Sequence, residues 1–141
     1  MNKKEQNRLN RLLDEYQKLF HMEEWDIDIK FEELGRTEDD WKVAGKSDAN
    51  ARYVYATIYI DPSVSEYDAR LILTHEFFHI VTSGLNYAVK NQIIKHEVAR
   101  GRRDLAWEIY KFQEEPVLQR LSSVFLGLLN QVNATKMKPS P

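Results

Sequence analysis

The chain has 141 residues, with 20 Lys and Arg against 22 Asp and Glu, a formal net charge of −2 and no cysteine. This length suits one compact domain, and 43% apolar residues can form a core, which excludes global disorder. Without cysteine there are no disulfides or thiolate ligands, so any metal must be bound by His and carboxylates. The near-neutral charge argues against nucleic-acid binding. A mean hydropathy of −0.58 and a polar N-terminus predict a cytoplasmic protein without membrane segments.

The N-terminal half changes its hydrophobic period once. Apolar residues at three-and-four spacing predict a helix over 5–20, and strict alternation predicts a strand over 25–31. A short strand near 41–44 is expected next, then turn residues over 45–50. The clearest strand covers 52–60, with one aliphatic face and one face of tyrosines. The dipeptide Asp61-Pro62 ends this strand, because proline cannot donate a hydrogen bond to the ladder.

Everything after this strand has helical character. Ser65 is a good N-cap for a helix that runs to about Gly84 and is apolar on nearly every side, which predicts central burial. Further helices are expected over 86–100, from Asp104, and after an interruption at Pro116. The predicted fold class is α+β: an N-terminal helix, a sheet of about three strands, then helices. A single domain over 5–132 and a flexible tail over 133–141 complete the prediction.

The segment Thr-His-Glu-Phe-Phe-His inside the buried helix carries the chemistry. His75 and His79 are four positions apart and therefore share one helical face, close enough to bind one cation. Glu76 lies beside them, where it can act as general base towards a metal-bound water. Imidazole ligands and a site with three protein ligands favour one Zn²⁺ ion. The sequence therefore predicts a zinc hydrolase.

The third ligand must come from another part of the chain. The extended metzincin pattern needs Gly and His where this chain has Thr82 and Leu85, so that pattern is excluded. Glu115 is the first choice because it begins an apolar helix that can direct it inward, Glu114 is the second and His96 the third. The other downstream candidates are Glu97, Asp104 and Glu108.

The HExxH helix, the strand end at residues 58–61 and a downstream glutamate on a second helix resemble the minimal gluzincin zinc metallopeptidases, including phage and prophage enzymes and ImmA/IrrE-like domains. The group's Glu-x-x-Ala-Asn-x-Phe-Ala pattern is matched loosely by Glu115, Leu118, Gln119, Leu121 and Ser122, and this chain departs from it with Pro116 after the glutamate and Gln119 in place of Asn. The resemblance covers about residues 5–130 and implies a bacterial or phage-encoded peptidase acting on a protein or peptide. No helix-turn-helix segment accompanies it.

The resemblance also implies supporting roles around the metal. Gln119 occupies the position from which these enzymes orient a histidine ligand. Three residues are candidates for stabilising the oxyanion: Tyr87, His96 and Tyr110. The strand before the HExxH helix is expected at the sheet edge, where its tyrosines would contact an extended substrate: Tyr53, Tyr55 and Tyr59.

Two other interpretations stay open. A catalytically inactive, metal-stabilised interaction module would keep the same ligands, and a hydrolase of non-peptide amides would keep the same chemistry. The basic segment 95–103 has no interleaved aromatic residues, so a solvated helix end is a better interpretation of it than nucleic-acid binding.

Overall fold

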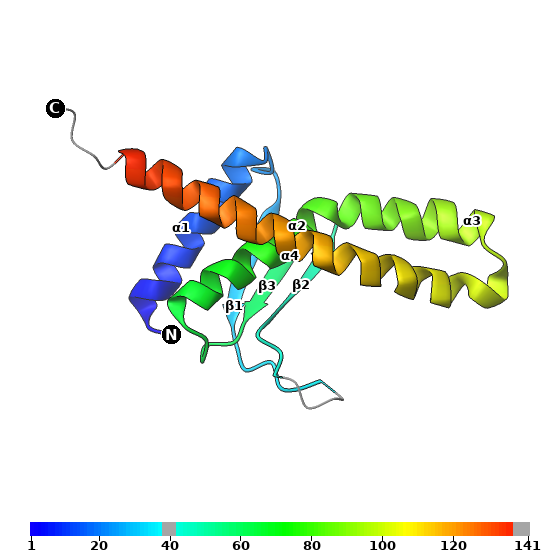
Figure 1. Cartoon of the computed structure of the whole chain (residues 1–141), viewed down its shortest axis with the longest axis horizontal. Helices are drawn as coiled ribbons and strands as arrows, with labels where there is room; N and C mark the ends of the chain where they lie inside the picture. Colours follow the sequence, from blue (N-terminus) through cyan, green and yellow to red (C-terminus); the bar gives the residue numbers. More distant parts are fainter. Residues whose placement is uncertain (38–41, 137–141) are drawn as a thin grey trace.

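A computed structural model describes residues 1–37 and 42–136 and confirms the α+β class (Figure 1). The N-terminal part contains α1 (Lys3–Leu19), β1 (Asp26–Phe31), β2 (Gly45–Asn50) and β3 (Tyr55–Ile60). The remainder contains α2 (Glu66–Ala88), the π-helix η1 (Val89–Ile94), α3 (Lys95–Glu97), the 3₁₀ turn η2 (Arg100–Arg102) and α4 (Arg103–Lys136). None of the described helices is both long and apolar enough to cross a membrane.

The three strands form one mixed sheet in the order β1-β3-β2. β3 lies in the centre, parallel to β1 and antiparallel to β2. Ala56, Ile58 and Ile60 point into the core, as the alternation predicts. Two expectations are wrong: residues 45–50 form a strand, not a turn, and β3 is not an edge strand. The strand β2 could not be predicted from its polar sequence. It is stabilised by pairing with β3 and packing against α2, not by the β propensity of its residues.

The short strand expected near 41–44 is only partly testable, because Trp41 lies outside the described residues. Lys42 forms an isolated antiparallel bridge with Arg36, and the two residues after it are not in a strand. The side chain of Lys42 reaches Ser63 and Asp61 beyond the end of β3. This region therefore connects the loop before β2 to the start of α2.

An aromatic cluster joins the helices to one another. Tyr16 of α1 contacts Phe77 of α2 and Phe125 of α4, with ring centroids 5.4 and 5.3 Å apart. Phe20 and Phe78 complete the cluster through edge contacts with the same rings. Because the Tyr16 hydroxyl is also hydrogen-bonded to Thr74 at 2.8 Å, the buried first half of α2 is fixed in position.

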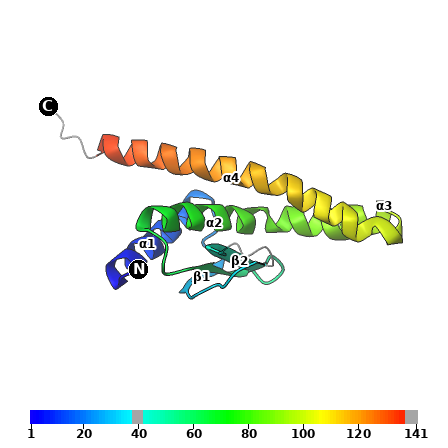
Figure 2. The ribbon, with the colours of Figure 1, turned by 60° about the horizontal axis from the view of Figure 1, so that its bottom comes forward.

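The helices are layered on the sheet. α2 lies on the sheet, and α4 crosses it on the side away from the strands (Figure 2). Ser65 caps α2 as predicted, accepting a hydrogen bond from the Asp68 amide at 3.1 Å. The helix does not end at Gly84: it continues to Ala88 and through η1 into α3. The helical stretch expected over 86–100 is thus the outer half of the same rod, which projects beyond the sheet (Figure 1).

α4 returns along this projection as one helix of 34 residues, so the interruption expected at Pro116 is wrong. Proline removes one backbone hydrogen bond and disfavours a helix interior, at a cost of about 3 kcal/mol. Beyond it, Leu118 and Leu126 are buried and Phe125 and Leu129 pack against the core, which offsets that cost. The helix also extends to Lys136, four residues into the segment expected to be a flexible tail, of which residues 137–141 lie outside the described part.

Candidate metal centre

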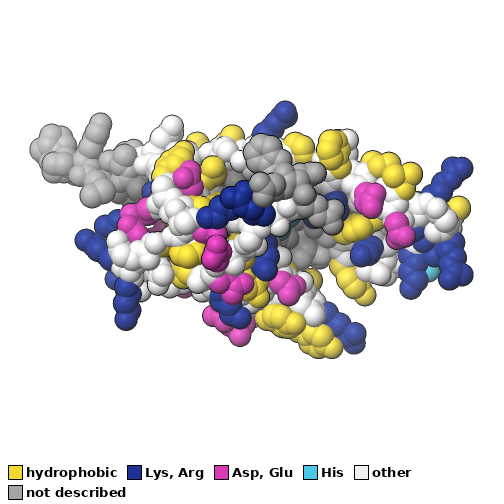
Figure 3. Space-filling view, turned by 90° about the horizontal axis from the view of Figure 1, so that it is seen from below, with side chains coloured by type: hydrophobic (Ala, Val, Ile, Leu, Met, Phe, Trp, Pro, Cys, Tyr) yellow, Lys and Arg dark blue, Asp and Glu magenta, His cyan; other side chains and the backbone are white. Residues whose placement is uncertain are grey.

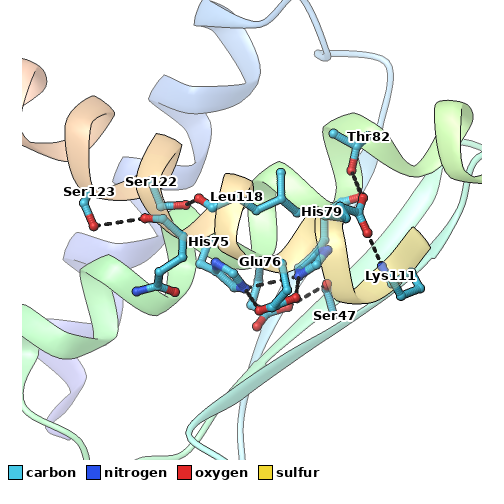
Figure 4. Close-up of polar contacts among 12 residues, drawn as sticks. Ser47, His75, Glu76, His79, Thr82, Lys111, Leu118, Ser122 and Ser123 are labelled. Carbon is cyan, nitrogen blue, oxygen red and sulfur yellow. Dashed lines mark hydrogen bonds and ion pairs between the residues drawn. The ribbon is translucent and has the colours of Figure 1, made fainter. Parts of the chain in front are cut away.

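Two histidines of α2 point to the same side of the helix (Figure 4). Their separation of four residues places the rings one turn apart, with centroids at 4.8 Å and the two Nε2 atoms at 3.1 Å. The side chains of His75 and His79 are 12% and 17% exposed. The helix alone thus brings two nitrogen ligands to one point at the surface of the core.

A carboxylate from α4 completes the cluster. Glu115 Oε1 lies 2.8 Å from His75 Nε2, and Oε2 lies 3.3 Å from His79 Nε2. A tetrahedral metal with bonds of about 2.0–2.1 Å separates its ligand atoms by about 3.3 Å. The Nε2–Nε2 distance of 3.1 Å is close to this value, and the two oxygens of Glu115 lie 2.8 and 3.3 Å from different histidines, which places the carboxylate beside both nitrogens. These three residues are the group of potential metal ligands found among the described residues.

The neighbouring carboxylate has a different position. The side chain of Glu114 is 7% exposed and is not part of the cluster: it accepts a hydrogen bond from Thr82 Oγ1 at 3.1 Å and forms an ion pair with Lys111. Burial raises the pKa of Glu114, but hydrogen bonds from Lys111, Asn86 and Thr82 outweigh it and hold the pKa below its ordinary value. Glu114 therefore fastens α4 to α2 as an anion, and only Glu115 faces the histidines.

His96 is not part of the cluster. It lies exposed in α3, at the far end of the projecting hairpin, where Lys and Arg side chains gather (Figure 3). The basic segment 95–103 forms this tip, as α3, η2 and the start of α4. The reason is that α2 does not end at Gly84 but carries its C-terminal continuation away from the site. This position argues against His96 both as third ligand and as oxyanion stabiliser.

Glu76 lies beside the cluster in a buried environment. It is 7% exposed, and its Oε2 accepts a hydrogen bond of 2.7 Å from the hydroxyl of Ser47 on β2 (Figure 4). Burial raises the pKa of Glu76, and the Ser47 hydrogen bond opposes that effect. Sequence reasoning missed Ser47 because it lies in the segment expected to be a turn. A raised pKa gives the carboxylate the proton affinity that a general base needs.

Close approach of β2 to α2 makes this hydrogen bond geometrically accessible. A Cβ built on Gly45 would lie 2.1 Å from Ile72 Cγ2 and 3.6 Å from Glu76 Oε1. Real side chains do not approach so closely, so β2 can lie against α2 here only with glycine at this position. Gly45 therefore sets the distance between the strand that carries Ser47 and the helix that carries Glu76.

The imidazoles differ in their surroundings. Burial lowers the pKa of His79, and the neighbouring His75 ring lowers it further, so the ring favours the neutral form that binds metals. Among the described residues, His75 Nδ1 is buried without a hydrogen-bond partner. Gln119 is exposed, and His75 Nδ1 has no hydrogen bond to it. The expected support of His75 by Gln119 is therefore not found among the described residues.

The cluster opens into a cleft of about 780 Å³ between β2, α2 and α4. Tyr87 lines this cleft, whereas the hydroxyl of Tyr110 donates to Asn86 Oδ1 at 2.7 Å and so ties α4 to α2. Polar and cationic side chains line it as well: Lys46, Ser83, Asn86, Lys90, Asn91 and Lys111. These residues lie on tertiary contacts between three elements, and no local pattern in the sequence marks them.

The predicted substrate strand is not at the cleft. β3 is paired on both sides, and Tyr55 and Tyr59 lie on the sheet face opposite the buried Ile58 and Ile60, with Tyr59 beneath the ammonium groups of Lys30 and Lys46. Tyr53 follows β2 in the turn and lines a smaller neighbouring cavity. The strand that lines the cleft is β2. In the described part of the chain β2 pairs with a strand on one side only.

Comparison of the chain with protein-family models, with curated proteins and with solved structures gives no match in any of the three. The interpretation of the site therefore depends on its own geometry. That geometry combines three convergent ligand atoms, a separate buried carboxylate with raised pKa, and an open cleft on the side of the ligands.

Proposed function

We propose that the chain is a zinc-dependent metallopeptidase, in which His75, His79 and Glu115 bind one Zn²⁺ ion and Glu76 is the general base. The observation that carries the proposal is the convergence of the two Nε2 atoms and the Glu115 carboxylate within 2.8–3.3 Å of one another. Two helices contribute to this convergence, so it is more than the local spacing of the HExxH segment.

Nitrogen and oxygen donors in this number suit zinc. Catalytic zinc sites use three protein ligands and leave a position for water, whose pKa falls to about 7 when it is bound. The open cleft next to the three donors is consistent with such a site. A structural zinc site would instead be closed by a fourth protein ligand.

Glu76 has the environment of a proton acceptor. Its backbone position next to His75 places the carboxylate at the edge of the cluster rather than among the three ligand atoms. Burial raises its pKa, and the Ser47 hydroxyl holds one carboxylate oxygen so that the other can face the cleft. Glu76 would take a proton from the attacking water and deliver it to the leaving amine.

A peptide fits the cleft better than a compact ligand. β2 lines one wall, and the strand has a backbone edge without a strand partner in the described part of the chain. An extended peptide can add to such an edge through main-chain hydrogen bonds. We therefore assign substrate binding to the backbone of β2 instead of the tyrosines of β3. The scissile carbonyl would then lie next to the histidines.

The decisive variant is Glu76→Gln. We expect it to bind zinc with an affinity close to that of the unmodified protein, because Glu76 is not a ligand, and to lower peptide hydrolysis by at least about a thousandfold. Zinc affinity would be measured by competition with a chromophoric chelator, and turnover with a library of fluorogenic peptides. Glu108→Gln on the exposed surface of α4 is the matched control and should retain both properties.

The outcomes separate the proposal from its alternatives. Full activity of the Glu76→Gln variant would overturn the role of Glu76, and failure of the unmodified protein to bind zinc would overturn the metal centre. Tight zinc binding without cleavage of any peptide would support the second candidate, an inactive module. The observation that favours that candidate is that the ligands come from α2 and α4, so a metal would also fasten these helices together.

A further inference from the structure

The cleft of the metal centre continues into the projecting hairpin. A second cavity of about 200 Å³ lies between η1 and α4 and shares Lys90, Asn91 and Trp107 with the cleft. The side chains that line it nearer the tip include Lys95, Arg103 and Asp104. The two cavities therefore form one groove that leads from the histidines towards the tip, and we call its outer part, the second cavity with Lys90, Trp107 and the adjoining Lys111, the hairpin groove.

Two ammonium groups from different elements meet in the hairpin groove. Lys90 Nζ of η1 lies 5.0 Å from the centroid of the Trp107 ring, and Lys111 Nζ of α4 lies 6.0 Å from the same ring. Lys111 is ion-paired with Glu114, whereas Lys90 has no carboxylate partner among the described residues. Lys90 therefore presents a positive charge that a ligand can neutralise, and the aromatic ring beneath it holds it at the groove.

The excess of positive charge extends over the whole outer hairpin. Residues 89–111 contain six Lys and Arg against three Asp and Glu, whereas the remainder of the chain contains 14 against 19. A cationic arm thus projects from an anionic body, and its Lys and Arg side chains gather at the end of the molecule (Figure 3). Such a separation of charge attracts the anionic part of a ligand to the hairpin and orients the ligand in the cleft.

An extended peptide bound to β2 would lead into the hairpin groove. Ser47 in the middle of β2 contacts Glu76 at the metal centre, and Asn50 at the end of the strand lines a small cavity with Ser83 and Tyr87. These two residues lie two or more turns further along α2 than Glu76. β2 therefore runs alongside α2 in the direction of the hairpin, and a peptide paired with its free edge follows the same direction.

We propose that the hairpin groove binds acidic side chains of the substrate, so that the enzyme prefers peptides with Asp or Glu about four or five residues to one side of the scissile bond; this rests on the proposed function, since the groove opens from the same cleft. Trp107 lies eight positions before Glu115, about 12 Å of helix, and Lys90 lies eleven positions after His79, about 16 Å. An extended peptide covers about 3.3 Å per residue, so these lengths correspond to about four and five residues.

An acidic peptide suits the hairpin groove better than a nucleic acid. A long phosphate backbone would extend from the hairpin along the body, where acidic residues outnumber basic ones and repel it. One or two carboxylates of a peptide instead reach the cations of the groove locally, while the rest of the peptide pairs with β2 through uncharged main-chain groups.

A positional scan of fluorogenic peptides tests the preference. Each position on either side of a cleaved bond would carry Ala, Glu or Lys in turn. At the positions about four and five residues away, on one side of the bond only, we expect Glu to raise kcat/KM about fivefold over Ala and Lys to lower it. Added salt should reduce this difference, because the groove is open to solvent. Equal kcat/KM values for Ala, Glu and Lys at these positions would overturn the preference and leave the proposed hydrolysis intact.

The Lys90→Glu variant tests the residue responsible. Lys90 is exposed, so its replacement leaves the core unchanged, and the new carboxylate should invert the preference, with Lys favoured over Glu at the same peptide positions. Lys30→Glu is the matched control, because Lys30 also lies over an aromatic ring, that of Tyr59, on the sheet face away from the cleft. A Lys90→Glu variant that still prefers Glu would overturn the proposal.

A binding measurement separates this proposal from hydrolysis itself. The Glu76→Gln variant, supplied with zinc, should bind a fluorescein-labelled peptide with a run of Glu residues at least about fivefold more tightly than the same peptide with Gln, as measured by fluorescence anisotropy. If no peptide is cleaved, the proposed function fails, and equal affinities for the two labelled peptides would overturn the acidic groove as well. Tighter binding of a single-stranded oligonucleotide of the same charge would also overturn it, because the groove would then be a nucleic-acid site.

Discussion

The body of the molecule and its projecting hairpin are stabilised by different interactions. The body contains α1, the sheet and the first half of α2, and its core side chains are almost fully buried, including Tyr16, Ile58 and Leu73. The hairpin contains the C-terminal end of α2 and the first turns of α4, and within residues 85–112 only Ile94 is buried. Hydrophobic burial therefore fixes the body, whereas the hairpin is held by polar and aromatic contacts between its two helices.

This difference locates the candidate metal centre at a boundary. His75, Glu76 and His79 belong to the rigid body, but Glu115 follows directly after the return of the hairpin. Its position depends on contacts such as Tyr110 with Asn86 and Glu114 with Thr82. The centre is complete only when α4 packs against α2 at the base of the hairpin, so a metal bound there would stabilise that packing.

Two truncations test the contrast most directly. Leu73→Ala in the body should lower the free energy of unfolding by about 3 kcal/mol, because a fully buried leucine leaves a cavity. Ile94→Ala should lower it by less than about 1 kcal/mol, because the hairpin can open locally while the body stays folded. Urea denaturation followed by far-ultraviolet circular dichroism measures both values.

Native-state hydrogen exchange gives a second measurement on the Leu73→Ala and Ile94→Ala variants. In the Ile94→Ala variant the amides of residues 89–106 should exchange faster, and those of residues 70–80 should not change. Equal losses of global stability in the two variants would show that body and hairpin unfold as one unit.

Glu115, the candidate ligand that α4 contributes, gives the next largest expected effect. Glu115→Gln should weaken zinc binding by at least about a hundredfold, because one of three charged or nitrogen donors is replaced by a neutral amide. Glu114→Gln is the matched control and should weaken it less than tenfold, since Glu114 contacts Lys111 and Thr82 rather than the histidines. Competition with a chelator measures both affinities, and an inverted order would exclude Glu115 as the third ligand.

Local patterns in the sequence were sufficient for the parts of the fold that depend on spacing. The apolar period of α2, its Ser65 cap and the common face of His75 and His79 all follow from residues within four positions of one another. The aliphatic face of β3 follows from alternation in the same way. These features survive in any tertiary arrangement, which is why they could be predicted.

Features that depend on distant contacts could not be predicted. β2 has turn-forming residues but becomes a strand because β3 and α2 contact it, and Ser47 reaches Glu76 only through that contact. The choice between Glu114 and Glu115 depends on how α4 crosses α2, which no local pattern encodes. Pro116 and Gly84 are typical of helix ends, yet both lie inside helices because buried residues on either side hold the helix together.

The contact between β2 and α2 offers a smaller perturbation within the body. Gly45→Ala should lower the free energy of unfolding by about 2 kcal/mol, because its Cβ would overlap Ile72 and force the strand outward. The shift should also lengthen the hydrogen bond between Ser47 and Glu76. Activity should therefore fall more than zinc affinity does.

Gly101→Ala in the hairpin is the matched control, because an added Cβ there meets no atom within 4 Å among the described residues. Thermal unfolding of both variants, together with peptide turnover, distinguishes the two positions. If Gly45→Ala leaves the unfolding temperature and the peptide turnover unchanged, β2 does not need its close approach to α2.

The smallest effect concerns acid stability at the end of β3. Hydrogen bonds from the Ser63 hydroxyl and amide, with Lys42 nearby, lower the pKa of Asp61 to about 2. A carboxylate with a depressed pKa stabilises the folded state above its unfolded pKa of about 4, and this contribution is lost as the pH falls through about 2. Asp61→Asn should therefore reduce the loss of stability between pH 4 and pH 2, measured by urea denaturation at each pH. Asp26→Asn, at an exposed position of β1, is the control. If the stability of Asp61→Asn depends on pH as steeply as that of the unmodified protein, Asp61 is not the source of this acid dependence.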